Sequence, residues 1–298
     1  MKKSSVSNWQ FIDPEGTFRI ENPHQSNYLY FPLVNEAGMK SAITPNLNGD
    51  VKTDQNVFLT PPQSVEDLHT SRAARNFWVY TPDIGAWSVT GNSALQNAHQ
   101  FSEPNTEEVS LEAGFLWHKL IRSSQEVGIC AETINFVPSS TDNVELMKVT
   151  LSNISQSDIS ITPTAAIPIY GRSADNLRDH RHVSSLLHRT HCSEYGVFIK
   201  PTLSFDERGH LPNTVTYAVL GIEDDGSKPI GFIPVPEDFI GEGGTLDWPE
   251  TIVRSLPPTA QAGYSYEGFE SIGGIRFADT VIKPGESKSI IIILTILD

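Results

Sequence analysis

Several common signals are scarce in this sequence. Its 298 residues include only two cysteines and three methionines, and 21 lysines and arginines stand against 36 aspartates and glutamates, for a formal net charge of −15. Binding to nucleic acid or to an anionic membrane surface needs a basic face on the protein. The charge balance therefore argues against both kinds of partner.

Long hydrophobic runs are missing as well. The longest, IIIILTIL at residues 290–297, is too short to span a bilayer and predicts a buried strand. No apolar segment follows the lysines near the start, as a secretory signal requires, so we expect a cytoplasmic protein. Cys130 and Cys192 are then expected to be reduced and structural.

The patterns that are present predict strands. Apolar and polar residues alternate at residues 16–21, 108–112, 158–162 and 214–220, and apolar strands are predicted at 27–34, 77–81, 115–121 and 144–154. Clusters of Gly, Pro, Asn and Asp separate them, and the best helical segment is short, at 183–189. The sequence predicts an all-β fold, a large sandwich of antiparallel sheets with few short helices. We expect one domain, residues 1–298, with a long excursion at 223–258.

The most unusual stretch is NLRDHRHVSSLLHRT, residues 176–190, which is rich in Arg and His within an acidic chain. Arg178, Asp179, His180 and Arg181 mix hydrogen-bond donors with acceptors. Sugar hydroxyls need such a mixture, because each hydroxyl both donates and accepts. Binding of an anion, or an ion-pair network that holds the loop in place, would use the same residue types.

A metal site is a weaker alternative for this stretch. It would use the histidines His180, His182, His188 and His191. Neither an H-E-x-x-H motif nor a cysteine pair supports it, so no metal is assigned.

Two further features attract attention. His69, Arg72 and Arg75 recur every three residues, and we expect them on the solvated face of a helical turn. Trp248 lies in the glycine-rich segment GGTLDWPE and is the best exposed aromatic for stacking on a sugar. Tryptophans at strand positions are expected in the core.

Motifs for catalysis are missing. No G-x-S-x-G elbow, phosphate-binding loop or dinucleotide fingerprint occurs. A glycosidase needs two placed carboxylates, and no spacing selects such a pair. No catalytic residue and no cofactor are therefore assigned.

The chain nevertheless resembles the N-terminal domain of the glycoside hydrolase family 94 phosphorylases, formerly glycosyltransferase family 36, which include the cellobiose and chitobiose phosphorylases. The resemblance is carried, in order along the chain, by FRIENPHQSNYLYFPLVNEAGMKSAITPNLNGD, SRAARNFWVY, ADNLRDHRHVSSLLHR, EDFIGEGGTLDWPE and IKPGESKSIIIILTILD.

This resemblance implies a β-supersandwich like that of galactose mutarotase. It also implies reversible phosphorolysis of β-glucosidic bonds with inversion, with inorganic phosphate as co-substrate and an oligosaccharide or a sugar 1-phosphate as substrate. In the family the catalytic aspartate belongs to a following (α/α)6 barrel, which has no counterpart positions here. We therefore expect a truncated chain or a split-gene product, inactive alone, whose partners are such a barrel and a second copy in a homodimer.

The family also has an Asn and an Arg of this domain in its acceptor-sugar subsite. Asn176 and Arg178 match them best, with Arg181 as an alternative. The run DHRH, residues 179–182, departs from the cellobiose-type pattern, which leaves the acceptor sugar open.

Two other functions stay open at this point. A stand-alone mutarotase-like epimerase would use His and Glu across a sheet cleft, with His180 and His182 as the first residues to test. A non-catalytic scaffold would instead use exposed apolar surface for association.

Overall fold

Antiparallel strands form most of the computed structural model, which describes residues 9–26, 29–63, 74–99, 107–178, 181–206 and 209–297. The largest sheet has eleven strands in the order β1-β2-β9-β10-β11-β12-β23-β18-β15-β14-β20. In chain order these are β1 (Trp9–Phe11), β2 (Phe18–Glu21), β9 (Glu107–Gly114), β10 (Trp117–Ser124), β11 (Ile129–Phe136), β12 (Val144–Asn153), β14 (Arg189–Cys192), β15 (Gly196–Ile199), β18 (Thr216–Glu223), β20 (Ser265–Glu267) and β23 (Ser287–Leu297).

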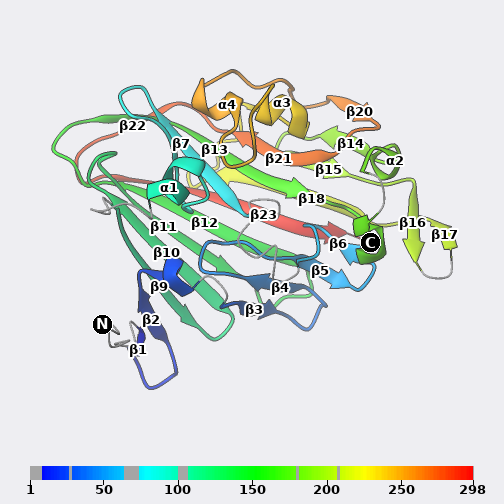
Figure 1. Ribbon diagram of the computed structural model, residues 1–298, viewed down its shortest axis with the longest axis horizontal. Helices are drawn as coiled ribbons and strands as arrows, with labels where there is room; N and C mark the ends of the chain where they lie inside the picture. Colours follow the sequence, from blue (N-terminus) through cyan, green and yellow to red (C-terminus); the bar gives the residue numbers. More distant parts are fainter. Residues whose placement is uncertain are drawn as a thin grey trace.

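A second sheet lies against the first (Figure 1). Its order is β19-β21-β13-β7-β8, and β22 pairs with the start of β13. These strands are β7 (Asn76–Thr81), β8 (Gly85–Ser88), β13 (Ile159–Ile169), β19 (Gly231–Phe232), β21 (Ser271–Arg276) and β22 (Thr280–Ile282).

The remaining elements are small. A four-stranded sheet consists of β3 (Phe31–Val34), β4 (Lys40–Ile43), β5 (Val51–Asp54) and β6 (Val57–Phe58), and a hairpin of β16 (Leu203–Asp206) and β17 (Gly209–Pro212). The helices are η1 (Pro23–Ser26), α1 (Ala94–His99), η4 (Ala174–Arg178), α2 (Arg181–Ser185), α3 (Pro236–Ile240) and α4 (Glu250–Val253). None of these described helices is long and apolar enough to cross a membrane.

The main core lies between the two large sheets. Period-two alternation puts Val149 of β12 and Ile292 of β23 on the inner face, opposite Ile167 of β13 and Ile275 of β21. Gly273 of β21 lets the two sheets approach closely. A β-carbon at this position would lie only 2.5 Å from that of Val219, so a larger residue would push the sheets apart.

The predicted strands are confirmed, including the segment at residues 290–297, which lies within the buried strand β23. The strand predicted at 27–34 is shorter, because β3 begins at Phe31. The helical prediction for 183–189 was partly wrong. Helix α2 ends at Ser185, and Arg189 already pairs with Glu267 in the large sheet. The two described cysteines are free thiols, and burial raises the pKa of Cys192 to about 12.

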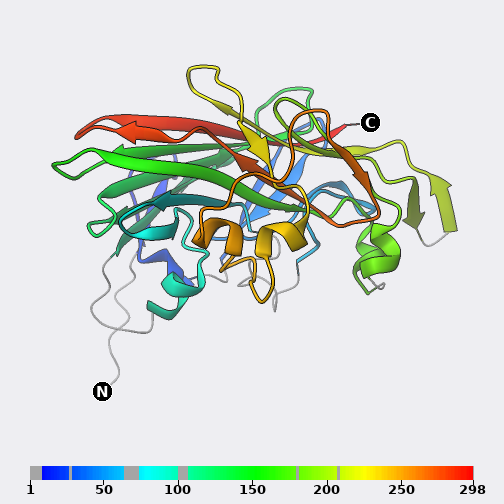
Figure 2. The same ribbon diagram turned by 90° about the horizontal axis from the view of Figure 1, so that it is seen from above.

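The excursion at 223–258 covers the outer face of the second sheet. Helices α3 and α4 lie there on the side away from the large sheet (Figure 2). Phe239 of α3 and Ile252 of α4 are buried against Trp78 and Ile272. This small second core fixes the loop that carries Leu246 and Trp248.

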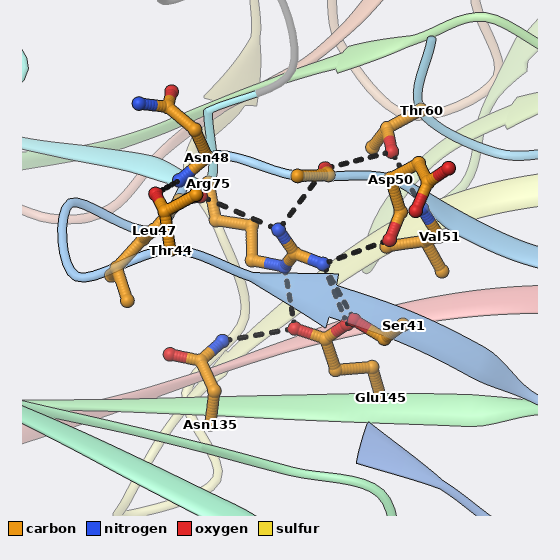
Figure 3. A network of polar contacts seen from close by, with 11 residues as sticks. Ser41, Thr44, Leu47, Asn48, Asp50, Val51, Thr60, Arg75, Asn135 and Glu145 are labelled. Atoms are coloured by element: carbon orange, nitrogen blue, oxygen red, sulfur yellow. Dashed lines mark hydrogen bonds and ion pairs between the residues drawn. The ribbon is translucent and has the colours of Figure 1, made fainter. Parts of the chain in front are cut away.

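The prediction for Arg75 was wrong, because its side chain is fully buried just before β7. Its Nε and Nη2 donate to the two carboxylate oxygens of Glu145 at 2.6 and 3.0 Å, and Nη1 donates to the carbonyls of Leu47 and Gly49 (Figure 3). His69 and Arg72 lie outside the described residues. Spacing of three residues indicated a local helix, whereas the deciding partner lies 70 positions away in β12.

Candidate functional site

A cavity of about 130 Å³ opens where β13 ends. Its walls come from segments far apart in the sequence: the end of β13, η4, the start of α3, the loop at 246 and the start of β21. Tyr170, Leu246 and Ile272 supply apolar surface, while Arg172, Asn176 and Glu270 supply polar groups. A smaller cavity of about 10 Å³ shares Arg172 and Asn176 with it. The site therefore lies on both sides of Arg172.

The chain turns sharply out of β13 to form this wall. Gly171 has φ +61°, in the left-handed region that favours glycine, and a β-carbon there would lie 3.4 Å from the Tyr217 ring. Residues on either side pair with the end of β6 and the residue after it. The Tyr170 N–H donates to the Leu59 carbonyl, and the Phe58 N–H donates to the Arg172 carbonyl. The backbone of Arg172 is thus fixed before its side chain makes any contact.

The Arg172 guanidinium is held by contacts on several sides. Nη2 donates to Glu270 Oε1 at 3.1 Å, Nη1 to Ser184 Oγ at 2.7 Å, and Nε to His188 Nε2 at 3.3 Å. The guanidinium also lies over the Tyr170 ring, 4.9 Å from its centroid. Charge-assisted hydrogen bonds and ring stacking together give this arginine one orientation.

His188 is uncharged in this setting. Burial, and secondarily the positive charge of Arg172, lower the pKa of His188 to about 3. Its Nε2 lone pair can therefore accept from Arg172 at neutral pH. Thus Glu270 supplies the negative charge that faces the guanidinium, and His188 supplies a neutral acceptor.

The sequence-predicted residues divide into two groups. Asn176 is buried and lines both cavities. Arg178 ends η4 and Arg181 begins α2, but their side chains, like all of Asp179 and His180, lie outside what the structure describes. The predictions for these four residues stay predictions.

Trp248 is 39% exposed, as expected for a loop tryptophan, but it lines neither cavity. Its neighbour Leu246 does, because Thr245 and Trp248 bridge to each other and turn the loop between them. Trp248 therefore lies on the outer side of the loop at 245–248, and Leu246 on its inner side lines the cavity.

The metal alternative gains no support in the described part of the chain, where no group of three His, Cys, Asp or Glu could hold an ion. His180 lies outside that part, as does the side chain of His182. His188 faces Arg172, and His191 Nδ1 contacts Ser265 Oγ at 2.9 Å.

Sequence reasoning missed the two residues that form the charged end of the cavity. Arg172 directly follows Gly171 and the apolar segment 165–170, and a charged residue at such a point was a usable signal. Glu270 gave none, because it lies 98 positions from Arg172 and only the antiparallel pairing of β21 with β13 brings it near.

Comparison with protein families identifies the chain. The family model for the glycosyl hydrolase 94 supersandwich domain matches residues 87–298. The chain belongs to this family. The predicted fold, a large antiparallel β-supersandwich with few short helices, is thereby confirmed by the family as well as by the sheets. The match also shows that this chain is a carbohydrate-related domain.

Solved structures give more distant similarities. A bacterial glucoamylase complexed with acarbose is 9% identical, with a TM-score of 0.47 over 90% of this chain and 32% of the glucoamylase chain. The GalM/aldose epimerase homologue from C. elegans is 10% identical, with a TM-score of 0.44 over 90% and 98% of the two chains. A galactose mutarotase-like protein from Clostridium acetobutylicum is 10% identical, with a TM-score of 0.40 over 97% and 98%. No curated protein sequence gives a significant match.

Proposed function

We propose that this family 94 domain is the carbohydrate-binding part of an inverting β-glucoside phosphorylase and contributes to its acceptor-sugar subsite. The observation that carries the proposal is the cavity under η4, which has Asn176 in its wall and both apolar and hydrogen-bonding groups around it. Sugar sites combine these two surfaces, because a pyranose ring has C–H faces and a hydroxyl edge.

The complete enzyme needs more than this domain. Under the proposal, an (α/α)6 barrel supplies the catalytic aspartate and the phosphate site, inorganic phosphate is the co-substrate, and a sugar 1-phosphate is the product. The proposal places the enzyme in the cytoplasm as a homodimer. Under the proposal, the segment from Asn176 to Arg181 contacts the acceptor sugar across the domain boundary.

An epimerase acting on the inner face of the large sheet is less compatible with the structure. His118 and Glu145 lie on that face, but both side chains are fully buried, and Glu145 is bound by Arg75, Ser41 and Asn135. A sugar cannot reach these two groups. His180 and the side chain of His182, the first residues to test for an epimerase, lie outside what the structure describes, so that alternative stays a prediction.

The first test is turnover by this chain alone. Incubated with glucose 1-phosphate and a panel of sugar acceptors, it should release no phosphate above the rate of a heat-denatured sample, because the proposed catalytic groups belong to the barrel. Robust phosphate release would contradict the proposal.

The second test changes Asn176→Ala and Arg178→Ala, one at a time, in an enzyme that includes the barrel. Losing one hydrogen bond to a neutral sugar costs about 1 kcal/mol, so KM for the acceptor should rise roughly fivefold to tenfold. The melting temperature should stay within a few degrees of wild type. If Arg178→Ala instead unfolds the domain with no selective effect on the acceptor, the loop-holding role of this stretch is correct.

A further inference from the structure

An apolar row crosses the outer face of the large sheet, on the side that points away from the core. It runs across β10, β11, β12, β23 and β18, where the direct cross-strand neighbours are, in this order, Trp117, Phe136, Leu146, Ile293 and Leu220. All five side chains are half-buried, and next to each along its strand stands a buried residue of the inner face. The sheet therefore exposes apolar surface along a line that crosses five strands.

We infer that this outer face binds a second copy of the chain, with the two large sheets packed face to face about a two-fold axis. The inference rests on the proposed function only for the expectation of a homodimer, and it names the surface that forms one. Helices α3 and α4 lie on the opposite side of the molecule (Figure 2). Since the start of α3 borders the sugar cavity, a second copy on the outer face leaves that cavity open.

The residues of this face differ from those of most sheets that meet water. Antiparallel sheets with one covered face commonly carry polar side chains on the other. The next row along the strands is nevertheless mostly apolar as well, and consists of Ile134, Lys148, Ile291 and Ile222. Contiguous apolar surface marks an interaction site, and a second sheet packed about 10 Å away buries such a surface.

The face is large enough for a stable contact between two copies. β10, β11 and β18 have eight residues each, and β12 and β23 are longer. Five strands about 4.8 Å apart, with a rise of about 3.3 Å per residue, cover roughly 600 Å² in projection. Side chains make the accessible area larger than the projection, so it approaches the value of about 800 Å² per partner that is typical of stable interfaces.

The charges of the face favour a second copy. The chain as a whole carries −15, so most of its surface repels another copy. The five strands, all within the described residues, place only Lys119, Lys148 and Glu132 on the outer face, two positive charges and one negative, for a sum of +1. Lys119 is held by Glu112 at 2.5 Å. Lys148 is exposed, and no ion pair to it is found in the described part of the chain.

A two-fold axis parallel to the strands, between β11 and β12, satisfies both the apolar and the charged groups. Such an axis puts β11 of one copy opposite β12 of the other and keeps each residue at its level along the strands. Phe136 then meets Leu146 of the second copy, since the two are level with each other. Lys148 is level with Ile134, two residues from Glu132, so it reaches Glu132 of the second copy diagonally. Each contact occurs twice, as in any symmetric dimer.

The test measures the mass of this chain by sedimentation equilibrium at about 0.15 M salt, where the Debye length of about 8 Å screens the net charge. Wild type at about 100 μM should have twice the monomer mass. Lys148→Glu and Glu132→Lys, each alone, should raise the Kd of the dimer at least about tenfold, because like charges then meet across the interface. The double variant exchanges the two signs and should restore the Kd to within about threefold of wild type, a rescue that a merely structural role would not produce.

A second pair of variants tests the apolar row. Leu146→Glu puts a charge at the centre of the interface and should leave the chain monomeric. Leu211→Glu is the matched control, because Leu211 is a leucine of β17, 56% exposed and away from the outer face, and its replacement should leave the dimer intact. The charge exchange keeps the inference testable if Leu146→Glu fails to fold.

A monomeric wild type at about 100 μM would overturn the inference. A dimer whose Kd is the same in Lys148→Glu, Glu132→Lys and Leu146→Glu would overturn it too, because another surface would then form the contact. The absence of rescue in the double variant would contradict the two-fold arrangement between β11 and β12. The proposed function fails by different results, since it depends on the turnover assay and on the acceptor KM of the complete enzyme.

Discussion

Glu145→Ala should lower the free energy of unfolding by about 3–5 kcal/mol, the usual cost of leaving a buried charge without its partner. Arg75 and Glu145 have no exposed side-chain surface, and every oxygen of Glu145 is used (Figure 3). Removing the carboxylate leaves the guanidinium with neutral partners only: Ser41 Oγ and the carbonyls of residues 47, 49 and 50. Urea unfolding followed by tryptophan fluorescence measures the loss.

The same network holds three parts of the fold together. Arg75 precedes β7 of the second sheet, Glu145 belongs to β12 of the large sheet, and the carbonyls belong to the loop between β4 and β5. We therefore expect the variant to lose cooperativity in the small sheet β3–β6 as well as stability overall. Faster amide exchange in residues 40–58 than in β12 would report this local effect.

Two controls test whether the loss of stability arises because the ion pair is buried, and not simply because an ion pair is broken. Glu250→Ala breaks the exposed pair with Arg254, whose side chain is 66% exposed, and should change stability by at most about 0.5 kcal/mol. Replacing both buried partners, Arg75→Met with Glu145→Leu, should recover much of the loss because no unpaired charge remains. A double variant as unstable as Glu145→Ala would contradict this explanation.

Acidification should destabilise the protein at pH values well above those at which carboxylates take up protons. Burial, and then the charge of Arg75, lower the pKa of His118 to about 3, and burial, followed by Arg172, lowers the pKa of His188 to about 3. Glu270 opposes the shift at His188, while Arg189 adds to it. Both histidines are uncharged in the fold but take up protons near pH 6.5 in the unfolded chain.

The sign follows from linkage. The unfolded state binds more protons below pH 6.5, so the stability contributed by each neutral histidine is complete above that pH and falls as pH drops from 6.5 toward 3. Within this window, each histidine lowers the free energy of unfolding by about 1.4 kcal/mol for each unit by which the pH falls. Between pH 7.5 and pH 5 the two together should cost roughly 4 kcal/mol, measured by urea unfolding at both values.

His118→Leu is the informative variant for this effect. Neither ring nitrogen of His118 has a hydrogen-bond partner among the described residues, and the ring packs against Phe31 with 5.3 Å between centroids. An apolar side chain of similar volume should therefore be tolerated at pH 7.5, and it should remove about half of the loss between pH 7.5 and pH 5. An unchanged pH dependence in this variant would show that His118 is accessible to protons in the fold.

The sequence by itself determined the strands. Alternating patterns such as that of residues 214–220, which lead into β18, state which side chains face a core, because a strand has a period of two residues. The apolar run at 290–297 indicated a buried strand, and it lies in the middle of the large sheet. The segments resembling family 94 were equally informative, since they identified the domain before any contact was known.

Only the tertiary structure decided which polar residues act together. Asn176 was found from its own segment, but Arg172 and Glu270 meet because β13 and β21 are antiparallel neighbours, and Arg75 meets Glu145 across two sheets. Local spacing describes neighbours within a few residues, whereas the free energy of a buried charge depends on the partner that the fold brings to it. For this reason the strand pattern could be predicted from residues alone, and the charged centre of the site could not.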